Sequence, residues 1–230
     1  PAPVRAWGSP SRYIQGPGLM DQLEKYTSVY GTRVAAVIDQ FFFESLTAQL
    51  KAQFEGTDSV IETVVFNSEV TEKQIDETTE KLRSFGPTVV VGIGGGKTLD
   101  TAKAVADNFG TPVVICPTAA STDAPTSALS VIYKESGEHS HARPYVSNPN
   151  LVLMDSAIIA KAPIRFLVSG MGDALSTVFE ARANALADHG NYINEKQGPF
   201  RRPKTAMAIA EFCYQTLLES GVQAKLAAEK

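Results

Sequence analysis

Hydrophobic positions along the chain fall into short continuous runs of strand length, separated by longer stretches with helical spacing. This alternation predicts βαβ units and a parallel sheet that is buried on both faces. The expected strands are residues 33–39, 60–66, 88–93, 112–116 and 151–155. The expected helices between them are residues 45–54, 71–85 and 98–108. Residues 128–133 alternate apolar and polar side chains, which is typical of one arm of a hairpin.

The pattern changes beyond Pro163, where every periodic segment is helical. Helices are expected at 173–186 and 203–219, with Pro203 in a first helical turn and Gly221 at a helix end. Hence we expect an α/β fold in two parts. A Rossmann-like domain with a parallel sheet would occupy residues 1–162, and residues 163–230 would begin an all-helical domain.

Apolar residues of the last expected helix lie on more than one of its faces, among them Met207, Phe212 and Leu217. A helix of this kind needs helical neighbours, and its uncovered surface would favour association. We therefore interpret the chain as a fragment or a truncated protein, or as one whose missing helices come from another polypeptide.

Composition and charge narrow the class of protein. With 43% hydrophobic residues and a net charge of -4, the chain resembles a globular protein and not a nucleic-acid binder, which needs a concentrated basic surface. The dense basic cluster Arg201–Lys204 is interpreted as a solvated loop. The sequence contains no apolar run of about 18 residues and no signal-peptide core at its start, so neither a membrane span nor export is expected. The prediction is a cytoplasmic protein, with Cys116 and Cys213 as core residues.

A glycine-rich loop, residues 92–98, joins an expected strand to an expected helix. Backbone N–H groups without a Cβ, at the positive end of a helix dipole, suit a pyrophosphate. Two better-known motifs do not fit: a Walker loop would need glycine in place of Val91, and the dinucleotide fingerprint would need glycine in place of Lys97. Taken alone, the loop is equally compatible with a tight turn that only packs strand against helix.

Longer stretches carry a resemblance to a known family. Residues 92–103 resemble the Gly-Gly-Gly-x-x-Asp-x-x-Lys signature of the superfamily of iron-containing alcohol dehydrogenases and dehydroquinate synthases. Residues 117–133, with Tyr13–Gly16 and Gly170–Leu175, are similar to the glycerol dehydrogenases within it. The resemblance covers essentially the whole chain. It implies that residues 1–162 form an NAD-binding domain and that residues 163–230 begin a metal-binding domain. It implies metal-assisted, NAD-dependent oxidation of glycerol, or of a related vicinal diol, to dihydroxyacetone or its counterpart.

The resemblance also implies roles in cofactor binding. Asp39, after the first expected strand, would bind the adenosine ribose of NAD and disfavour the 2′-phosphate of NADP. The residues implied to hold the pyrophosphate are Gly94, Gly95, Gly96, Lys97 and Thr98. Further cofactor contacts are implied for Thr118, Ser121, Ser127, Leu129 and Tyr133. From local pattern alone, Asp39 could simply end a strand and open a turn, and Leu129 could be an ordinary strand residue.

Two aspartates are implied in catalysis. Asp123 would contact a substrate hydroxyl, and Asp173 would be one of three protein ligands of a catalytic divalent metal, expected to be zinc. Local pattern alone suggests that Asp123 forms an Asx-turn and that Asp173 is a helix N-cap. The family's other two ligands are histidines further along, and His139, His141 and His189 do not occupy those positions. The 230-residue chain alone could therefore be inactive. A small polyol is the expected substrate and a homo-oligomer the expected assembly.

Alternative functions remain open at this stage. A dehydroquinate-synthase-like lyase or a glycerol-1-phosphate dehydrogenase would need a basic pocket for an anionic substrate, and residues 117–133 contain no Lys or Arg. A third alternative is a module that binds NAD without turnover, suggested by the missing histidines. A purely structural α/β domain is the fourth.

Overall fold

The computed structural model describes residues 3–192 and 197–229, which form two compact units. The sheet unit consists of Pro10–Ala119 and Ala124–Ile159. The helical unit contains the described residues of Pro1–Ser9, Ala120–Asp123 and Ala160–Lys230. The short segment 120–123 thus belongs to the helical unit although the sequence on both sides of it belongs to the sheet unit. The domain boundary expected at residue 162 stays a prediction.

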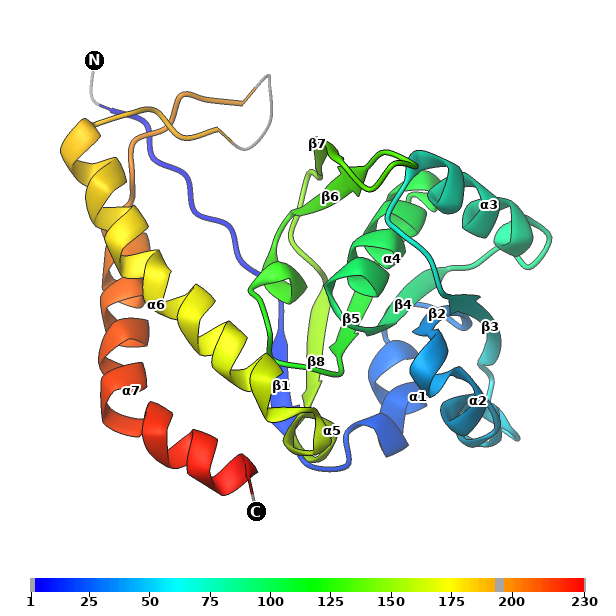
Figure 1. The fold of residues 1–230 in the computed structure, drawn as a ribbon. Helices are drawn as coiled ribbons and strands as arrows, with labels where there is room; N and C mark the ends of the chain where they lie inside the picture. The colour runs from blue at the N-terminus through cyan, green and yellow to red at the C-terminus, as the bar shows by residue number, and fades with distance from the viewer. Residues whose placement is uncertain (1–2, 193–196, 230) are drawn as a thin grey trace. The chain divides into compact units, whose positions relative to one another are not determined.

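A six-stranded parallel sheet forms the centre of the sheet unit (Figure 1). Its strands are β1 (Tyr13–Gly16), β2 (Arg33–Asp39), β3 (Val60–Phe66), β4 (Val89–Gly94), β5 (Val113–Pro117) and β8 (Leu151–Asp155), in the order β1-β8-β5-β4-β2-β3. The central strands are almost wholly buried because both faces are covered. This confirms the predicted fold class. β1 was not expected as a strand, since four half-exposed residues at a sheet edge give no hydrophobic run.

Helices cover the two faces of this sheet (Figure 1). The 3-10 helix η1 (Met20–Gln22), α1 (Leu23–Thr27) and α2 (Gln40–Phe54) pack on one face. On the other face lie α3 (Glu72–Arg83) and α4 (Gly96–Phe109). Alternate residues of β2 divide between the two hydrophobic clusters, as the two-residue period of a strand requires: Val34 and Ile38 on one side, Val37 on the other.

A two-stranded antiparallel hairpin adds to the α3–α4 side. Its strands are β6 (Leu129–Tyr133) and β7 (His139–Pro144), preceded by the 3-10 turn η2 (Ala124–Thr126). The hairpin was predicted from the alternation at 128–133, and the structure confirms it. Ile132 is fully buried in the cluster formed with α3 and α4.

Three helices extend at least five residues beyond their expected bounds. α2 begins at Gln40, because the Asp39 carboxylate accepts a hydrogen bond from the Phe41 N–H at 2.9 Å and so caps the helix. α6 runs over Ile164–Ala187 and α7 over Lys204–Ala228. The predictions that a helix starts at Asp173 and that Gly221 ends one are therefore wrong. Glycine in a helix interior costs only about 1 kcal/mol relative to alanine, which a long packed helix tolerates.

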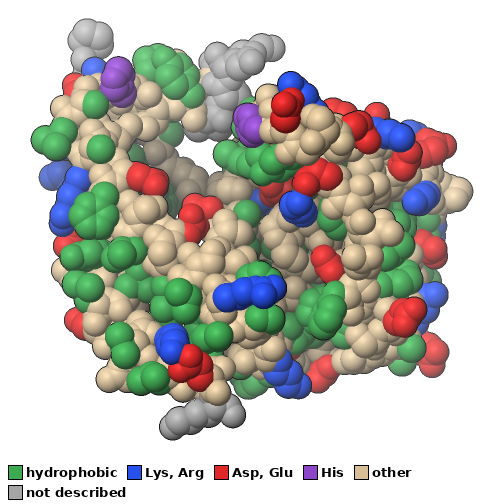
Figure 2. Space-filling model, in the orientation of Figure 1, with side chains coloured by type: hydrophobic (Ala, Val, Ile, Leu, Met, Phe, Trp, Pro, Cys, Tyr) green, Lys and Arg blue, Asp and Glu red, His purple; other side chains and the backbone are tan. Residues whose placement is uncertain are grey.

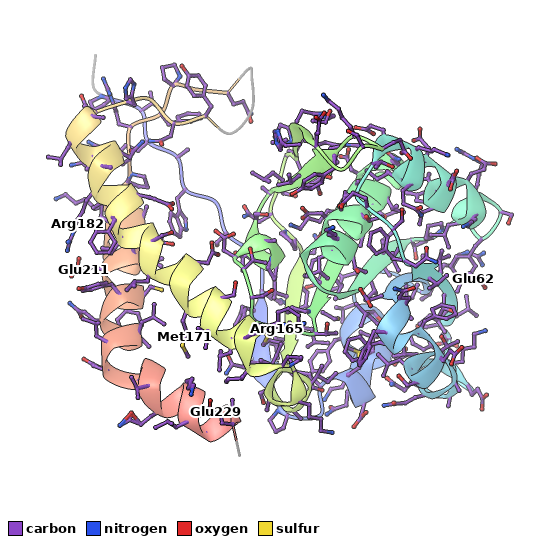
Figure 3. The ribbon with its side chains drawn as sticks, in the orientation of Figure 1. Glu62, Arg165, Met171, Arg182, Glu211 and Glu229 are labelled. Carbon is purple, nitrogen blue, oxygen red and sulfur yellow. The ribbon has the colours of Figure 1, made fainter. Side chains whose placement is uncertain are left out.

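The main helices of the helical unit, α6 and α7, pack along each other (Figure 1). The short helix α5 (Ser156–Lys161) precedes α6 in the chain. Arg182 of α6 points toward Glu211 of α7 and forms an ion pair with it at 2.9 Å (Figure 3). Hydrophobic side chains remain exposed on both helices (Figure 2). They include Phe179, Leu186, Phe212, Leu218 and Val222. Among the described helices, none combines the length and the apolar character needed to cross a membrane.

The order of the strands creates a switch point beside β2. The chain passes from β2 to β3 on one side and then crosses to β4 on the other, so β2 pairs with both. Open α/β sheets bind ligands in the crevice that such a reversal opens at the carboxyl ends of the strands. Asp39 ends β2 and Gly94 ends β4, so both lie at that edge.

Candidate functional site

The glycine turn between β4 and α4 contains glycines with different surroundings. A Cβ at Gly92 would lie 2.7 Å from the Ala102 Cβ, so this glycine allows β4 and α4 to approach closely. At Gly94 (φ +157°) a Cβ would lie 2.7 Å from the Thr98 Oγ1 and 2.9 Å from the Asp39 Cβ. At Gly95, by contrast, a Cβ would meet nothing within 4 Å. Part of the turn therefore serves packing, and part of it faces open space.

The start of α4 has the properties of an anion site. Its N-cap residue, Gly95, has extended backbone angles, and no side chain caps the helix. Its first turn carries no acidic residue either. First-turn N–H groups lack intrahelical acceptors, and the helix dipole makes this end positive. Backbone donors next to the open space at Gly95 can thus receive a phosphate group.

Lys97 brings a positive side chain to the same helix start. Its Nζ lies 2.5 Å from the Glu69 Oε2, while its side chain is 60% exposed. An ion pair of a largely exposed lysine is worth little, so a stronger anion can compete with Glu69 for this ammonium group.

Asp39 reaches the glycine turn from β2. One of its carboxylate oxygens accepts the N–H of Phe41, and the other accepts the hydroxyl of Thr98 at 3.3 Å. Asp39 therefore ends β2, as local pattern suggested, and caps α2, which local pattern did not suggest. The two hydrogen bonds fix its carboxylate beside the turn.

Thr118 completes this edge of the sheet unit. It follows β5, is 5% exposed, and donates its N–H to the Gly94 carbonyl at 3.0 Å. Predicted cofactor residues on β2, β4, α4 and β5 are thus brought together by direct contacts. These residues are far apart in the sequence, and only the parallel arrangement of the strands makes them neighbours.

The remaining predicted cofactor residues of the sheet unit lie on the hairpin segment. Ser127 donates its hydroxyl to the Ala124 carbonyl at 3.0 Å. Leu129 is 38% exposed, and Tyr133 donates its N–H to the Val70 carbonyl at 2.7 Å. A buried ion pair in α4, Asp100–Lys103, holds this segment. The sequence analysis gave that pair no role of its own, although Asp100 and Lys103 are the Asp and Lys of the family signature over residues 92–103.

In the helical unit, the two aspartates that the resemblance implies in catalysis lie side by side. The Asp123 N–H donates to the Asp173 Oδ2 at 3.0 Å. The Ser169 hydroxyl donates to the Ser121 carbonyl at 3.3 Å, so the segment 120–123 lies directly on α6. Asp173 is an interior residue of α6 and not its N-cap, which corrects the expectation from local pattern.

A complete metal centre is not present in the described part of the chain, since it contains no group of three or more His, Cys, Asp or Glu side chains placed to hold an ion. His139 and His141 are exposed on β7, and His189 is exposed after α6. Three protein ligands are usual for a catalytic zinc. Among the residues described, the resemblance implies Asp173 alone as a ligand, so they do not by themselves fit a catalytic metal.

An open parallel α/β sheet with a glycine turn at its switch point is the architecture of the Rossmann-like class of proteins. Within this class, residues 10–156 match the model of the iron-containing alcohol dehydrogenase family, and the chain belongs to that family.

Several known proteins are similar along nearly the whole chain. Glycerol dehydrogenase of Escherichia coli is 42% identical, and glycerol dehydrogenase of Thermotoga maritima is 45% identical; each alignment covers 96% of this chain and 59% of the relative. The crystal structure of a probable glycerol dehydrogenase from Sinorhizobium meliloti superimposes with a TM-score of 0.90 at 40% identity, covering 98% of this chain and 60% of that one. The chain thus spans about three fifths of the length of these relatives.

Proposed function

We propose that this chain forms the NAD-binding part of a glycerol dehydrogenase and contributes two aspartates to its substrate and metal site. The observation that carries the proposal is the glycine turn: uncapped helix donors and open space lie at the switch point of the sheet, directly beside the Asp39 carboxylate. The relatives named as glycerol dehydrogenases support the substrate.

Each of the residues at this edge of the sheet has a proposed role in binding the cofactor. Asp39 accepts the hydroxyls of the adenosine ribose, and its negative charge repels the 2′-phosphate of NADP. The N–H groups of residues 94–98 bind the pyrophosphate. Thr118 lies next to the turn, and Ser127, Leu129 and Tyr133 contact the nicotinamide side. Bound NAD supplies the hydride acceptor for oxidation of the carbinol carbon.

The aspartates of the helical unit serve the substrate. Asp123 accepts a hydrogen bond from a polyol hydroxyl and thereby fixes the direction of the substrate chain. Its backbone N–H holds Asp173, which fixes the orientation of that carboxylate. Asp173 is this chain's contribution to the divalent metal site, with zinc as the proposed ion.

Steady-state kinetics test the activity. With a divalent metal present, the complete glycerol dehydrogenase of which this chain would form the NAD-binding part should reduce NAD in the presence of glycerol, with net formation of NADH. Asp123→Asn should raise the KM for glycerol, because a neutral amide accepts the substrate hydroxyl less strongly. Unchanged kinetics in this variant would remove Asp123 from the substrate site. Turnover of a substrate without net consumption of NAD would favour the lyase, and NAD binding without any turnover would favour the non-catalytic module.

A further inference from the structure

A buried lysine in α4 connects that helix to the segment before β6. The Lys103 side chain is 2% exposed, and its ammonium nitrogen lies within hydrogen-bond distance of four oxygen atoms. They belong to the Asp100 carboxylate at 3.2 Å, the Ala124 carbonyl at 2.5 Å, the Ser127 hydroxyl at 3.0 Å and the Leu129 carbonyl at 3.2 Å. Three of these partners lie within residues 124–129, so one cation orders six consecutive residues.

Asp100 also holds the residues that follow this segment, through its side chain and through its backbone carbonyl. Its Oδ2 accepts the N–H of Val131 at 3.0 Å, and its backbone carbonyl accepts the hydroxyl of Ser130 at 2.8 Å. Burial raises the pKa of this carboxyl, against the opposing effects of the Lys103 charge and the Val131 N–H. The carboxylate therefore depends on its partners, and removing either member of the pair would leave the other charged and buried.

The position of the pair within α4 gives it a consequence for the cofactor. α4 begins at Gly96, in the glycine turn, so Asp100 and Lys103 lie within two turns of the proposed phosphate site. A single rigid helix thus presents the phosphate-binding donors at its start and holds the segment 124–131 by its side chains. Ser127 and Leu129, proposed to contact the nicotinamide side, lie on that segment.

We propose that Asp100 and Lys103 form a positioning pair, which fixes residues 124–131 relative to the glycine turn and so sets the place of the nicotinamide ring. This proposal rests on the proposed NAD site. We do not propose that Asp100 or Lys103 contacts the cofactor itself, because their side-chain polar atoms form hydrogen bonds within the protein.

The sharpest test compares two ligands that differ in one part. NAD reaches both the glycine turn and the hairpin segment, whereas ADP-ribose lacks the nicotinamide ring and depends on Asp39 and the turn. In the purified chain, Lys103→Met should weaken binding of NAD by about tenfold or more and change the Kd of ADP-ribose by less than about twofold. Lys81→Met, which removes the same charge from the exposed surface of α3, serves as the matched control and should change neither Kd.

The outcomes separate this proposal from the one it rests on. If the unaltered chain binds neither ligand, the proposed NAD site fails. If it binds both, and Lys103→Met weakens both equally or neither, the NAD site stands and the positioning role is overturned. A purely structural role would affect both ligands alike.

A second variant covers the case in which Lys103→Met does not fold. Asp100→Asn keeps an oxygen acceptor but lacks the negative charge facing Lys103. We expect a smaller loss of affinity, about threefold, again confined to NAD. We also expect faster hydrogen exchange at the Val131 amide, measured without any ligand. Unchanged exchange and unchanged NAD affinity in a folded Asp100→Asn protein would overturn the proposal.

Discussion

Gly94 and Gly95 are adjacent residues under opposite constraints. A side chain at Gly94 would overlap with Thr98 and Asp39, whereas a side chain at Gly95 would point into open space. Packing alone explains the first glycine. Packing gives no reason for a glycine at position 95. A ligand that approaches the backbone closely would give such a reason.

Alanine substitutions should distinguish these two constraints. Gly95→Ala should leave the free energy of unfolding within about 1 kcal/mol, since the backbone there is extended and the added methyl meets no atom. It should nevertheless weaken NAD binding by at least about tenfold, because the methyl would occupy the proposed place of the pyrophosphate. Gly94→Ala should lower the free energy of unfolding by about 1–3 kcal/mol through overpacking. Denaturant unfolding and calorimetric titration measure both effects, and a Gly95→Ala protein that binds NAD normally would contradict the assignment.

Asp39 combines a capping role with a proposed ribose contact, and a conservative variant can separate them. Asn is as good an N-cap as Asp, so Asp39→Asn should leave stability nearly unchanged. Loss of the charge should reduce the preference for NAD over NADP by about tenfold. Asp39→Ala should in addition lose about 0.5–2 kcal/mol from the missing cap. Competition titrations with both cofactors provide the check; an unaltered preference in Asp39→Asn would exclude the ribose role.

Local sequence predicted the residues of the glycine turn but not their partners. The loop was recognisable because glycines stand between a hydrophobic run and a helical pattern. The Glu69–Lys97 ion pair joins residues 28 positions apart, and its formation depends on the crossover from β3 to β4. No local pattern contains that information.

At the scale of elements, α6 shows why a glycine can mislead. Gly170 and Gly172 suggested a break before Asp173, yet the helix runs through both. A Cβ at Gly170 would lie 2.1 Å from the Ala120 carbonyl oxygen, so this glycine lets the segment 120–123 lie against α6. The contact joins residues 50 positions apart and is visible only in three dimensions.

The two glycines of α6 should therefore respond differently to alanine. Gly172→Ala meets no atom within 4 Å and should stabilise the helical unit by up to about 1 kcal/mol through higher helix propensity. Gly170→Ala should destabilise it and displace Asp123 from Asp173, which would raise the KM for glycerol. Thermal unfolding and steady-state kinetics of the two glycine variants measure this contrast, and equal stabilisation by both substitutions would refute it.

Asp155 fixes the junctions after β1 and after β8. Its carboxylate is 3% exposed and accepts N–H groups from Gly18, Met20 and Ala157 at 2.9–3.1 Å. Burial acts to raise the pKa of this carboxyl, but the backbone hydrogen bonds outweigh it and the pKa lies below its ordinary value.

This lowered pKa gives a signed prediction for stability. The contribution of Asp155 is fully present above the unfolded-state pKa of about 3.9 and is lost as the pH falls through the lower pKa of the folded state. Asp155→Asn should thus lower the free energy of unfolding at neutral pH by about 1–3 kcal/mol and weaken its decline in acid. Unfolding curves between pH 7 and about pH 3 test this prediction. If the free energy of unfolding fell equally steeply in acid for both proteins, the prediction would be contradicted.

At the scale of the whole molecule, sequence reasoning recovered five of the six strands of the parallel sheet but not their order. Buried parallel strands are continuous apolar runs and are readily detected, as β2, β4 and β8 show. Their order depends on crossovers and on the short edge strand β1, which pairs with β8 more than 130 residues away. The same holds for residues 120–123, whose packing in the helical unit follows from contacts with α6 and not from their neighbours in sequence.

The central claim is that the glycine turn at the switch point binds the pyrophosphate of NAD. Titration of the purified chain with NAD, followed through the NMR signals of the backbone amides of residues 95–98, tests this claim most directly. We predict saturable binding to one site, with those amides among the most strongly shifted. Absence of saturable binding at millimolar NAD, or saturation that leaves these amides unshifted, would contradict it.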